Sequence, residues 1–188
     1  MTTLPTTSTT IGVAIAVPDP WGAQLQEYRT ALGDLRAGGI PTHVTLLPPH
    51  RVERADQPVI EKHLAEASAS SNPFAIHLRG TGTFRPVSPV VFVTVAEGIS
   101  ACEELAAAVQ RGPLEMEREF PYHPHVTVAH HLPDEYLDRA FDEMADFECD
   151  FVVDRFSLYV HDARAGWVPT RDFQLGTGSE DLDVLWPL

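Results

Sequence analysis

Two copies of the tripeptide His-Val-Thr contain the side chains of this sequence that are best suited to chemistry. They are His43-Val44-Thr45 and His125-Val126-Thr127, and a chain of this composition should contain roughly 0.07 such tripeptides by chance. In a β-strand, residues two apart point to the same face, so each imidazole stands beside a hydroxyl about 6.6 Å away along the backbone. Two such strands facing each other would line one cleft with two imidazoles and two hydroxyls.

A pair of imidazoles can break a phosphodiester bond without a metal ion. Histidine titrates near neutral pH, so one ring can be neutral and activate the nucleophile while the other protonates the leaving oxygen. Thr45 and Thr127 can donate hydrogen bonds to the non-bridging phosphate oxygens, and bonds to an anion are stronger than neutral ones. A single strand histidine is more often structural, but the matched pair favours acid–base catalysis by His43 and His125. Which histidine is the acid stays open, because the two copies are nearly equivalent.

The tripeptides occupy matching places in a repeated order of strands and helices. Apolar strands begin at Ile11 and Val90, and each precedes an amphipathic helix, a His-Val-Thr strand, a second helix and a further strand. The chain therefore contains one β-α-β-α-β unit written twice. The expected strands, apart from the two tripeptides, are 11–17, 74–78, 90–95, 151–160 and 167–175, and the expected helix caps are Asp19, Asp56, Ser100 with Glu103, and Asp134.

This duplication predicts a single bilobal domain over residues 1–188. The first lobe is expected at 11–85 and the second at 90–175, with 86–89 as the hinge between them. Residues 1–10 and 176–188 are expected to be tails, the latter ending in apolar residues that would dock on the body. A glycine-rich stretch at 80–83 should bend or bulge its strand.

Composition limits the partners and the compartment. The formal net charge is −14, and an acidic surface repels phosphate backbones, so a long nucleic acid is disfavoured. Cys102 and Cys149 have no metal-ligand spacing and are expected to be buried thiols in a reducing compartment. The sequence has no signal-peptide pattern and no apolar run of the ~18 residues that a membrane span needs. A cytoplasmic location is therefore the simplest expectation.

The sequence resembles the two-histidine (2H) phosphoesterases, and in particular their 2′-5′ RNA ligase / cyclic phosphodiesterase (LigT-like) branch. The resemblance covers roughly 11–160 and includes 41–47 (PTHVTLL), 82–86 (GTFRP) and 121–129 (PYHPHVTVA). It implies an α+β fold of two pseudo-symmetric lobes with antiparallel sheets around a central cleft. It also implies opening of cyclic phosphodiesters, typically 2′,3′-cyclic phosphates, although some members trim or join RNA ends.

The same resemblance implies a role for each motif residue. His43 and His125 would be the acid–base pair, and Thr45 and Thr127 would bind phosphate. Relatives often place an arginine where this chain has His130, and a histidine binds phosphate as a cation only when it is protonated. Together with the acidic net charge, this departure favours a small cyclic phosphate over polymeric RNA.

Four further assignments come from neighbouring residues. Arg85 could contact phosphate or form a surface ion pair, and the two readings are about even. Phe84 and Tyr122 could stack on a nucleobase or belong to the core. No metal is expected, because the histidines at 123, 125, 130 and 131 have no carboxylate or cysteine at ligand spacing.

Three functions are thus compatible with the residues. The first is a metal-independent, cofactor-free hydrolase of cyclic phosphodiesters, acting on a small cyclic nucleotide or an RNA-end cyclic phosphate. The second is an RNA-end 2′-5′ ligase or trimming enzyme. The third is a non-catalytic module that binds a nucleotide or phosphate, which the presence of both histidines and both threonines does not encourage. The sequence does not indicate an oligomeric state.

Overall fold

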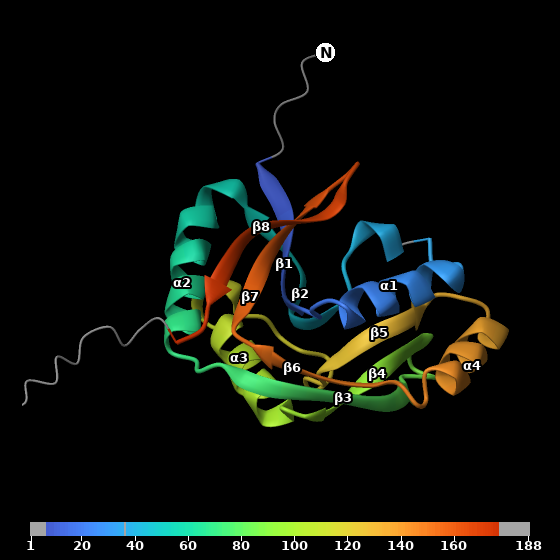
Figure 1. Cartoon of the computed structure of the whole chain (residues 1–188). Helices are drawn as coiled ribbons and strands as arrows, with labels where there is room; N and C mark the ends of the chain where they lie inside the picture. The colour runs from blue at the N-terminus through green and yellow to red at the C-terminus, as the bar shows by residue number, and fades with distance from the viewer. Residues whose placement is uncertain (1–6, 36, 177–188) are drawn as a thin grey trace, which may run out of the picture.

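The protein folds around one antiparallel β-sheet flanked by helices (Figure 1). A computed structural model describes residues 7–35 and 37–176. Within them the sheet has eight strands in the order β6-β3-β4-β5-β2-β1-β7-β8. The strands are β1 (Ser8–Ala16), β2 (His43–Glu53), β3 (Phe74–Thr83), β4 (Val90–Glu97), β5 (His125–His130), β6 (Glu148–Val153), β7 (Arg155–Asp162) and β8 (Gly166–Gln174). The α-helices are α1 (Trp21–Ala31), α2 (Gln57–Ala69), α3 (Ile99–Val109) and α4 (Asp134–Glu143), with short 3-10 turns at Ala37–Gly39, Arg54–Asp56 and Gly112–Leu114.

The sheet has two pseudo-symmetric halves that meet between β2 and β5. One half contains β1, β2, β7 and β8, and the other contains β3, β4, β5 and β6. The third strand of each unit pairs with the first strand of the other unit, as β3 does with β4 and β7 with β1. The half with β3 to β6 comes from one continuous segment, 74–153, whereas the other half joins β1 and β2 to β7 and β8 from the far end of the chain. The expected lobes 11–85 and 90–175 therefore do not match the halves of the sheet. The expected hinge at 86–89 lies in the short connection that lets β3 and β4 pair as sequence neighbours.

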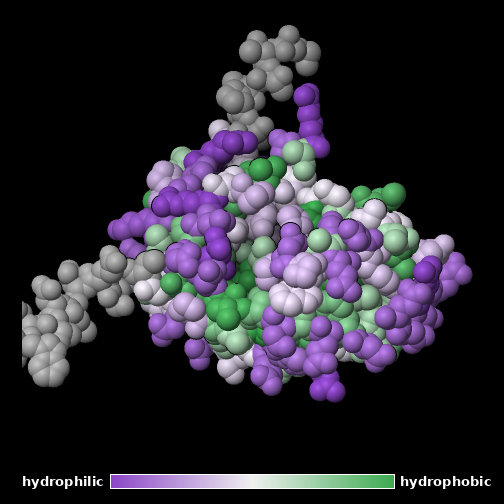
Figure 2. All heavy atoms as spheres, viewed as in Figure 1, coloured by the Kyte–Doolittle hydropathy of each residue, from purple (hydrophilic) through white to green (hydrophobic). Residues whose placement is uncertain are grey.

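The helices are distributed between the halves in the same crossed way. Helix α1 contacts β5 and α4 contacts β3, β4 and β5, whereas α3 contacts β2 and α2 contacts α3 and β8. The apolar faces expected from helical periodicity are buried, for example at Leu25, Leu64, Leu105 and Leu137. Hydrophilic side chains cover the outer sides of α2 at the left and α4 at the right of the view (Figure 2).

The ends of several elements differ from the sequence expectations. Strand β1 begins at Ser8 rather than Ile11, because Ser8 pairs with Glu53 at the end of the long strand β2. Most of the two expected tails lies outside the described residues, namely 1–6 and 177–188. The expected docking of the apolar C-terminal end falls in this part of the chain. The bulge expected at 80–83 is confirmed by a register shift between Leu78 and Thr81, with Gly80 at φ +70°.

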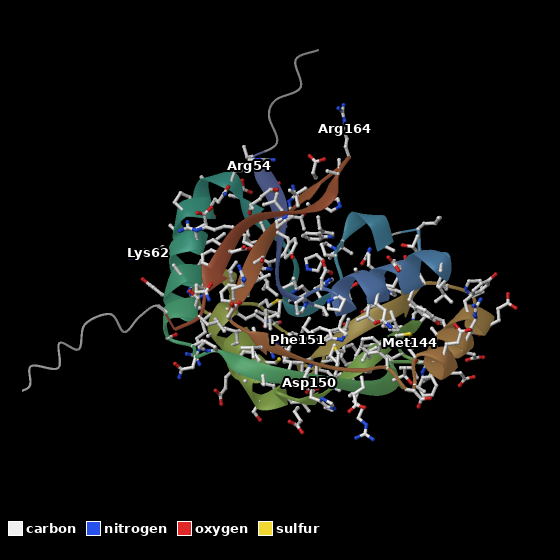
Figure 3. All side chains as sticks on the ribbon, viewed as in Figure 1. Arg54, Lys62, Met144, Asp150, Phe151 and Arg164 are labelled. Atoms are coloured by element: carbon white, nitrogen blue, oxygen red, sulfur yellow. The ribbon has the colours of Figure 1, made fainter. Side chains whose placement is uncertain are left out.

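The expected strand 151–160 is two strands, β6 and β7. The chain leaves the edge of one half of the sheet at Val153 and enters the other half at Arg155. On β6, Phe151 is buried while its neighbour Asp150 is exposed (Figure 3). Side chains alternate between the two faces in the same way in β6 and β7, so the sequence could not reveal that the paired strands change at Asp154.

The expected helix caps are confirmed only in part. The Asp19 carboxylate accepts a hydrogen bond from the Ala23 amide at 3.0 Å, but α1 begins at Trp21 and its N-cap residue is Pro20 rather than Asp19. The capping box of Ser100 and Glu103 is absent, because α3 begins two residues earlier than this box requires, after Gly98 at φ +93°. Glycine adopts this left-handed conformation without the steric cost that a Cβ brings.

Two further observations concern the cysteines and membrane-spanning segments. Cys102 and Cys149 are buried and free, as expected, and burial raises the pKa of the Cys102 thiol to about 12. No helix within the described residues is both long and apolar enough to cross a membrane.

Candidate active site

The two His-Val-Thr segments lie at the junction of the sheet halves. Strands β2 and β5 are antiparallel there, with Val44 as the register partner of Val126. Both valine side chains are fully buried, whereas the flanking histidines and threonines are half-buried. Side chains alternate across a strand, so the four polar groups lie together on the face opposite the valines. The register directs His43 toward Thr127 and Thr45 toward His125.

Each strand that carries a His-Val-Thr motif has a bulge directly after its threonine. The register of β2 with β1 shifts between Thr45 and Leu47, and the register of β5 with β4 shifts between Thr127 and Ala129. Two consecutive buried residues follow each threonine, and the next side chain is half-buried again. A bulge adds one residue to a strand and so changes which face the following residues occupy.

The bulge of β5 places His130 on the same face as His125 and Thr127. Its counterpart on β2 is Pro48, which lines the pocket described below. His130 stacks on His131, with ring centroids 3.9 Å apart, and its charge is one of the influences that lower the pKa of His125. The structure thus brings His130 to the site, as the sequence led us to expect.

Each motif histidine is oriented by the carbonyl group two residues before it. His43 Nδ1 lies 2.7 Å from the Pro41 carbonyl oxygen, and His125 Nδ1 lies 2.7 Å from that of His123. A carbonyl oxygen only accepts hydrogen bonds, so Nδ1 carries the proton in both rings. Nε2 is therefore the nitrogen left for proton transfer in both halves.

Burial lowers the pKa of both histidines. Desolvation is the largest cause for His43, and the nearby Arg29 guanidinium lowers its pKa further. The pKa of His125 falls to about 4, first because of burial and then because His123, His43 and His130 repel its positive charge. The free protein therefore holds both imidazoles mainly neutral at pH 7.

The position of His43 also depends on α1. The Thr42 hydroxyl donates to Gln26 Oε1 at 2.9 Å, and Gln26 donates in turn to the Ala37 carbonyl. Arg29, also on α1, forms a buried ion pair with Asp34 at 2.7 Å. These contacts fix the segment that precedes β2.

Two phenylalanine rings surround His125. The centroids of Phe84 and Phe92 lie 4.9 and 5.0 Å from that of the imidazole. Phe92 lies across Gly82, its register partner on β3, where a Cβ would come within 2.5 Å of the ring. Gly82 thus leaves the space that this aromatic support needs.

A pocket of about 660 Å³ opens beside Thr45 and His125. Phe84, Val87 and Ser88 line one wall. The segment 116–123, which leads into β5, lines another. A pocket of this size suits a ligand of nucleotide dimensions.

Tyr122 lines this pocket, as its expected contact with substrate requires. Its hydroxyl donates to the Thr45 carbonyl at 2.8 Å, and burial raises the pKa of the phenol. Phe84 lines the pocket as well and also packs on Phe92. Its stacking on a nucleobase stays a prediction.

Arg85 lies elsewhere. Its guanidinium pairs with Asp138 at 2.8 Å and with Asp134 at 3.7 Å on α4, and Arg85 does not line the pocket. Of its two readings, the surface ion pair is the one that the geometry favours.

Sequence reasoning missed several residues of the pocket. Gln110 and Arg118 line it, and they lie in segments without a motif. His123 lines it too and stacks near His125 at 6.2 Å between centroids. Alignment of the two units would have found His123, because it occupies the position of Pro41. Among the described residues, no group of three or more His, Cys, Asp or Glu side chains is arranged to hold a metal ion.

Known proteins resemble this chain in sequence and in fold. A protein of Bacillus cytotoxicus, named as a candidate phosphoesterase, is 32% identical over 145 residues, covering 75% of this chain and 83% of that protein. A Bacillus cereus protein named in the same way is 30% identical over 144 residues, covering 74% and 82%.

Solved structures show the same fold. LigT from E. coli in its apo form superposes with a TM-score of 0.64 at 19% identity, covering 89% of this chain and 98% of LigT. TT0787 from Thermus thermophilus gives a TM-score of 0.59 at 23% identity, covering 89% and 98%. The family model of the 2′-5′ RNA ligase superfamily matches residues 17–165. The chain therefore belongs to the 2′-5′ RNA ligase superfamily and is an enzyme of the 2H phosphoesterase group.

Proposed function

We propose that this protein hydrolyses small cyclic phosphodiesters of the 2′,3′-cyclic phosphate type without a metal ion. The observation that carries the proposal is the matched pair of histidines, each with Nδ1 fixed by a carbonyl oxygen at 2.7 Å and Nε2 left for proton transfer. The cyclic phosphate would lie over the face of β2 and β5 that carries these histidines, within reach of Thr45 and Thr127.

The reaction needs one neutral and one protonated imidazole. Nε2 of one histidine takes a proton from water, the water oxygen bonds to phosphorus, and the bond from phosphorus to one ribose oxygen breaks. That oxygen receives its proton from Nε2 of the other histidine, and the product is a phosphomonoester. The threonine hydroxyls donate to the non-bridging oxygens, whose charge grows in the transition state.

Substrate binding supplies the protonated imidazole. The lowered pKa values of His43 and His125 make the neutral form of both available in the free enzyme. A bound phosphodiester anion favours the protonated form of the imidazole next to it and so raises the pKa of that imidazole. The two rings then titrate as a coupled pair rather than as independent groups.

The pocket favours a nucleotide as substrate. It continues from Thr45 and His125 along Phe84 and Tyr122, and aromatic residues that line a pocket are the usual partners for stacking on a base. E. coli LigT has been solved with 3′-AMP, with NADP+ and with ATP, which are small adenine nucleotides. A single nucleotide also suits a chain with a net charge of −14 better than a long RNA does.

A substrate screen with and without chelator tests this proposal. Wild-type protein is incubated with 2′,3′-cyclic nucleotides, with 3′,5′-cyclic nucleotides and with short RNA ending in a cyclic phosphate. We expect hydrolysis of the 2′,3′-cyclic nucleotides at the same rate in EDTA. Loss of that activity in EDTA would contradict the metal-independent mechanism, and joining of RNA ends without hydrolysis would favour a ligase.

A further inference from the structure

Arg118 occupies a fixed position on the wall of the active-site pocket. Its Nε donates to Gln110 Oε1 at 2.7 Å, and its guanidinium carbon lies 5.4 Å from the centre of the Tyr122 ring. Both neighbours are tied to the bulged part of β2. Gln110 donates to the Leu46 carbonyl at 2.5 Å, and Tyr122 donates to that of Thr45 at 2.8 Å. Through Gln110 and Tyr122, the position of Arg118 is thus coupled to β2, the strand that carries the first motif.

The charge of Arg118 is not neutralised by a carboxylate contact. Within the described residues, its hydrogen-bond partner is an amide oxygen and no carboxylate forms an ion pair with it. Other arginines of the protein do have such partners, namely Arg29, Arg85, Arg139, Arg155 and Arg171. A planar guanidinium with Nε engaged still has the four N–H groups of its Nη1 and Nη2 atoms, which match a phosphate in a bidentate geometry.

We propose that Arg118 binds a second anionic group of the substrate, so that the preferred substrate is a nucleotide with a phosphate in addition to the cyclic one. A 5′-phosphorylated nucleoside 2′,3′-cyclic phosphate is the simplest such molecule. The inference rests on the proposed function, which places the cyclic phosphate beside Thr45 and His125, and Arg118 lines the same pocket as these two residues.

The flanking residues make direct contact with Arg118 necessary. Glu117 and Glu119 line the same wall and are exposed. Their carboxylates repel an anion anywhere else on this wall, so selectivity for a second phosphate depends on one guanidinium. Replacement of Arg118 by a neutral residue should therefore remove the preference for substrates with a second phosphate, rather than weaken the binding of all substrates equally.

The test compares adenosine 2′,3′-cyclic phosphate with its 5′-phosphorylated form. We expect wild-type enzyme to have the higher kcat/KM for the 5′-phosphorylated form, through a lower KM. The ratio of the two kcat/KM values should fall by about tenfold or more in Arg118→Gln, because a charge-assisted bidentate contact is lost. Arg118→Lys should keep part of the ratio, since it keeps the charge without the fork. Arg111→Gln, an exposed arginine of the same segment outside the pocket, should keep all of it.

Two results would overturn the inference. One is a wild-type enzyme that does not prefer the 5′-phosphorylated form. The other is an Arg118→Gln variant whose ratio stays within twofold of wild type, which would leave Arg118 as a support for β2 alone.

Failure of the proposed function can be told apart from failure of this inference. If wild type hydrolyses neither compound, calorimetry with adenosine 3′-monophosphate and adenosine 3′,5′-bisphosphate still tests the second phosphate site. The bisphosphate should bind more tightly to wild type, and Arg118→Gln should lose that difference. Equal affinities in wild type would refute the site on their own.

Discussion

Val44 on β2 and Val126 on β5 are register partners, and through them the two halves of the sheet join. Both side chains are fully buried, so the residues on either side of each valine face the opposite way. One apolar pair therefore sets the relative position of the two histidines and the two threonines. This relationship brings residues that are 82 positions apart in the chain to one face of the sheet.

The lowered pKa values of the histidines predict an acidic optimum for kcat/KM. The active free enzyme needs one protonated ring, yet the pKa of His125 is about 4 and that of His43 lies below 6.5. The protonated form is lost as pH rises through these values, so kcat/KM should fall about tenfold per unit on the alkaline side. Because the bound anion raises the pKa of the ring it contacts, kcat should persist to higher pH than kcat/KM. Initial rates from pH 4 to 9 check this, and a kcat/KM that rises between pH 6 and 8 would contradict it.

Replacement of either motif threonine by valine should reduce activity without loss of the fold. Thr45→Val and Thr127→Val keep the β-branched shape and remove the hydroxyl that donates to the phosphate. A hydrogen bond to a charged group contributes about 1.5–3 kcal/mol, which corresponds to roughly 10–100-fold in kcat/KM. Thr30→Val, at an exposed position on α1, is the matched control and should change kcat/KM by less than twofold. Full activity in both motif variants would remove the threonines from the site.

Gly82→Ala should disturb His125 through Phe92. The new Cβ would lie 2.5 Å from Phe92 Cε2, so the ring has to move, and the ring supports the imidazole at 5.0 Å between centroids. We expect a loss of about 1–3 kcal/mol in the free energy of unfolding, as in other overpacked sites, together with a lower kcat. Denaturant titration and steady-state kinetics measure the two effects. Gly38→Ala is the control, because a Cβ there meets nothing within 4 Å.

Arg85→Gln should leave catalysis nearly unchanged. The guanidinium pairs with exposed carboxylates on α4, at 2.8 Å from Asp138 and 3.7 Å from Asp134, and it does not line the pocket. Partly exposed ion pairs contribute about 0–1 kcal/mol to stability, so the melting temperature should fall slightly. A tenfold increase in KM for a cyclic nucleotide would instead show that Arg85 reaches the phosphate.

The sequence predicted which polar side chains share one face of the sheet better than it predicted the pairing of strands. The two His-Val-Thr copies identified His43 and His125 because strand periodicity alone puts each imidazole beside a hydroxyl. The partners of β3 and β7 could not be read from the chain, since alternation is the same whichever half of the sheet a strand joins. The caps show a similar limit, because Ser100 and Glu103 fit a capping box but Gly98 begins the helix earlier.

The pocket wall was beyond reach of sequence patterns for a different reason. Gln110 lines the wall through its contact with the Leu46 carbonyl, which is distant in the chain. Arg118 does so through its contact with the ring of Tyr122. Such contacts have no period and no motif. His130 is an intermediate case, because the sequence drew attention to it but only the bulge after Thr127 explains why it lies on the same face as His125.

The most direct test of the central claim is the kcat for 2′,3′-cyclic AMP of His43→Ala, His125→Ala and the double variant, each shown to be folded by circular dichroism. General acid and general base catalysis each contribute about 10²–10⁴-fold, and two groups that act in one step are not additive. We predict that each single variant loses at least 10²-fold and that the double variant loses far less than the product of the two losses. If either single variant keeps more than a tenth of the wild-type kcat, the two histidines are not the acid–base pair of this enzyme.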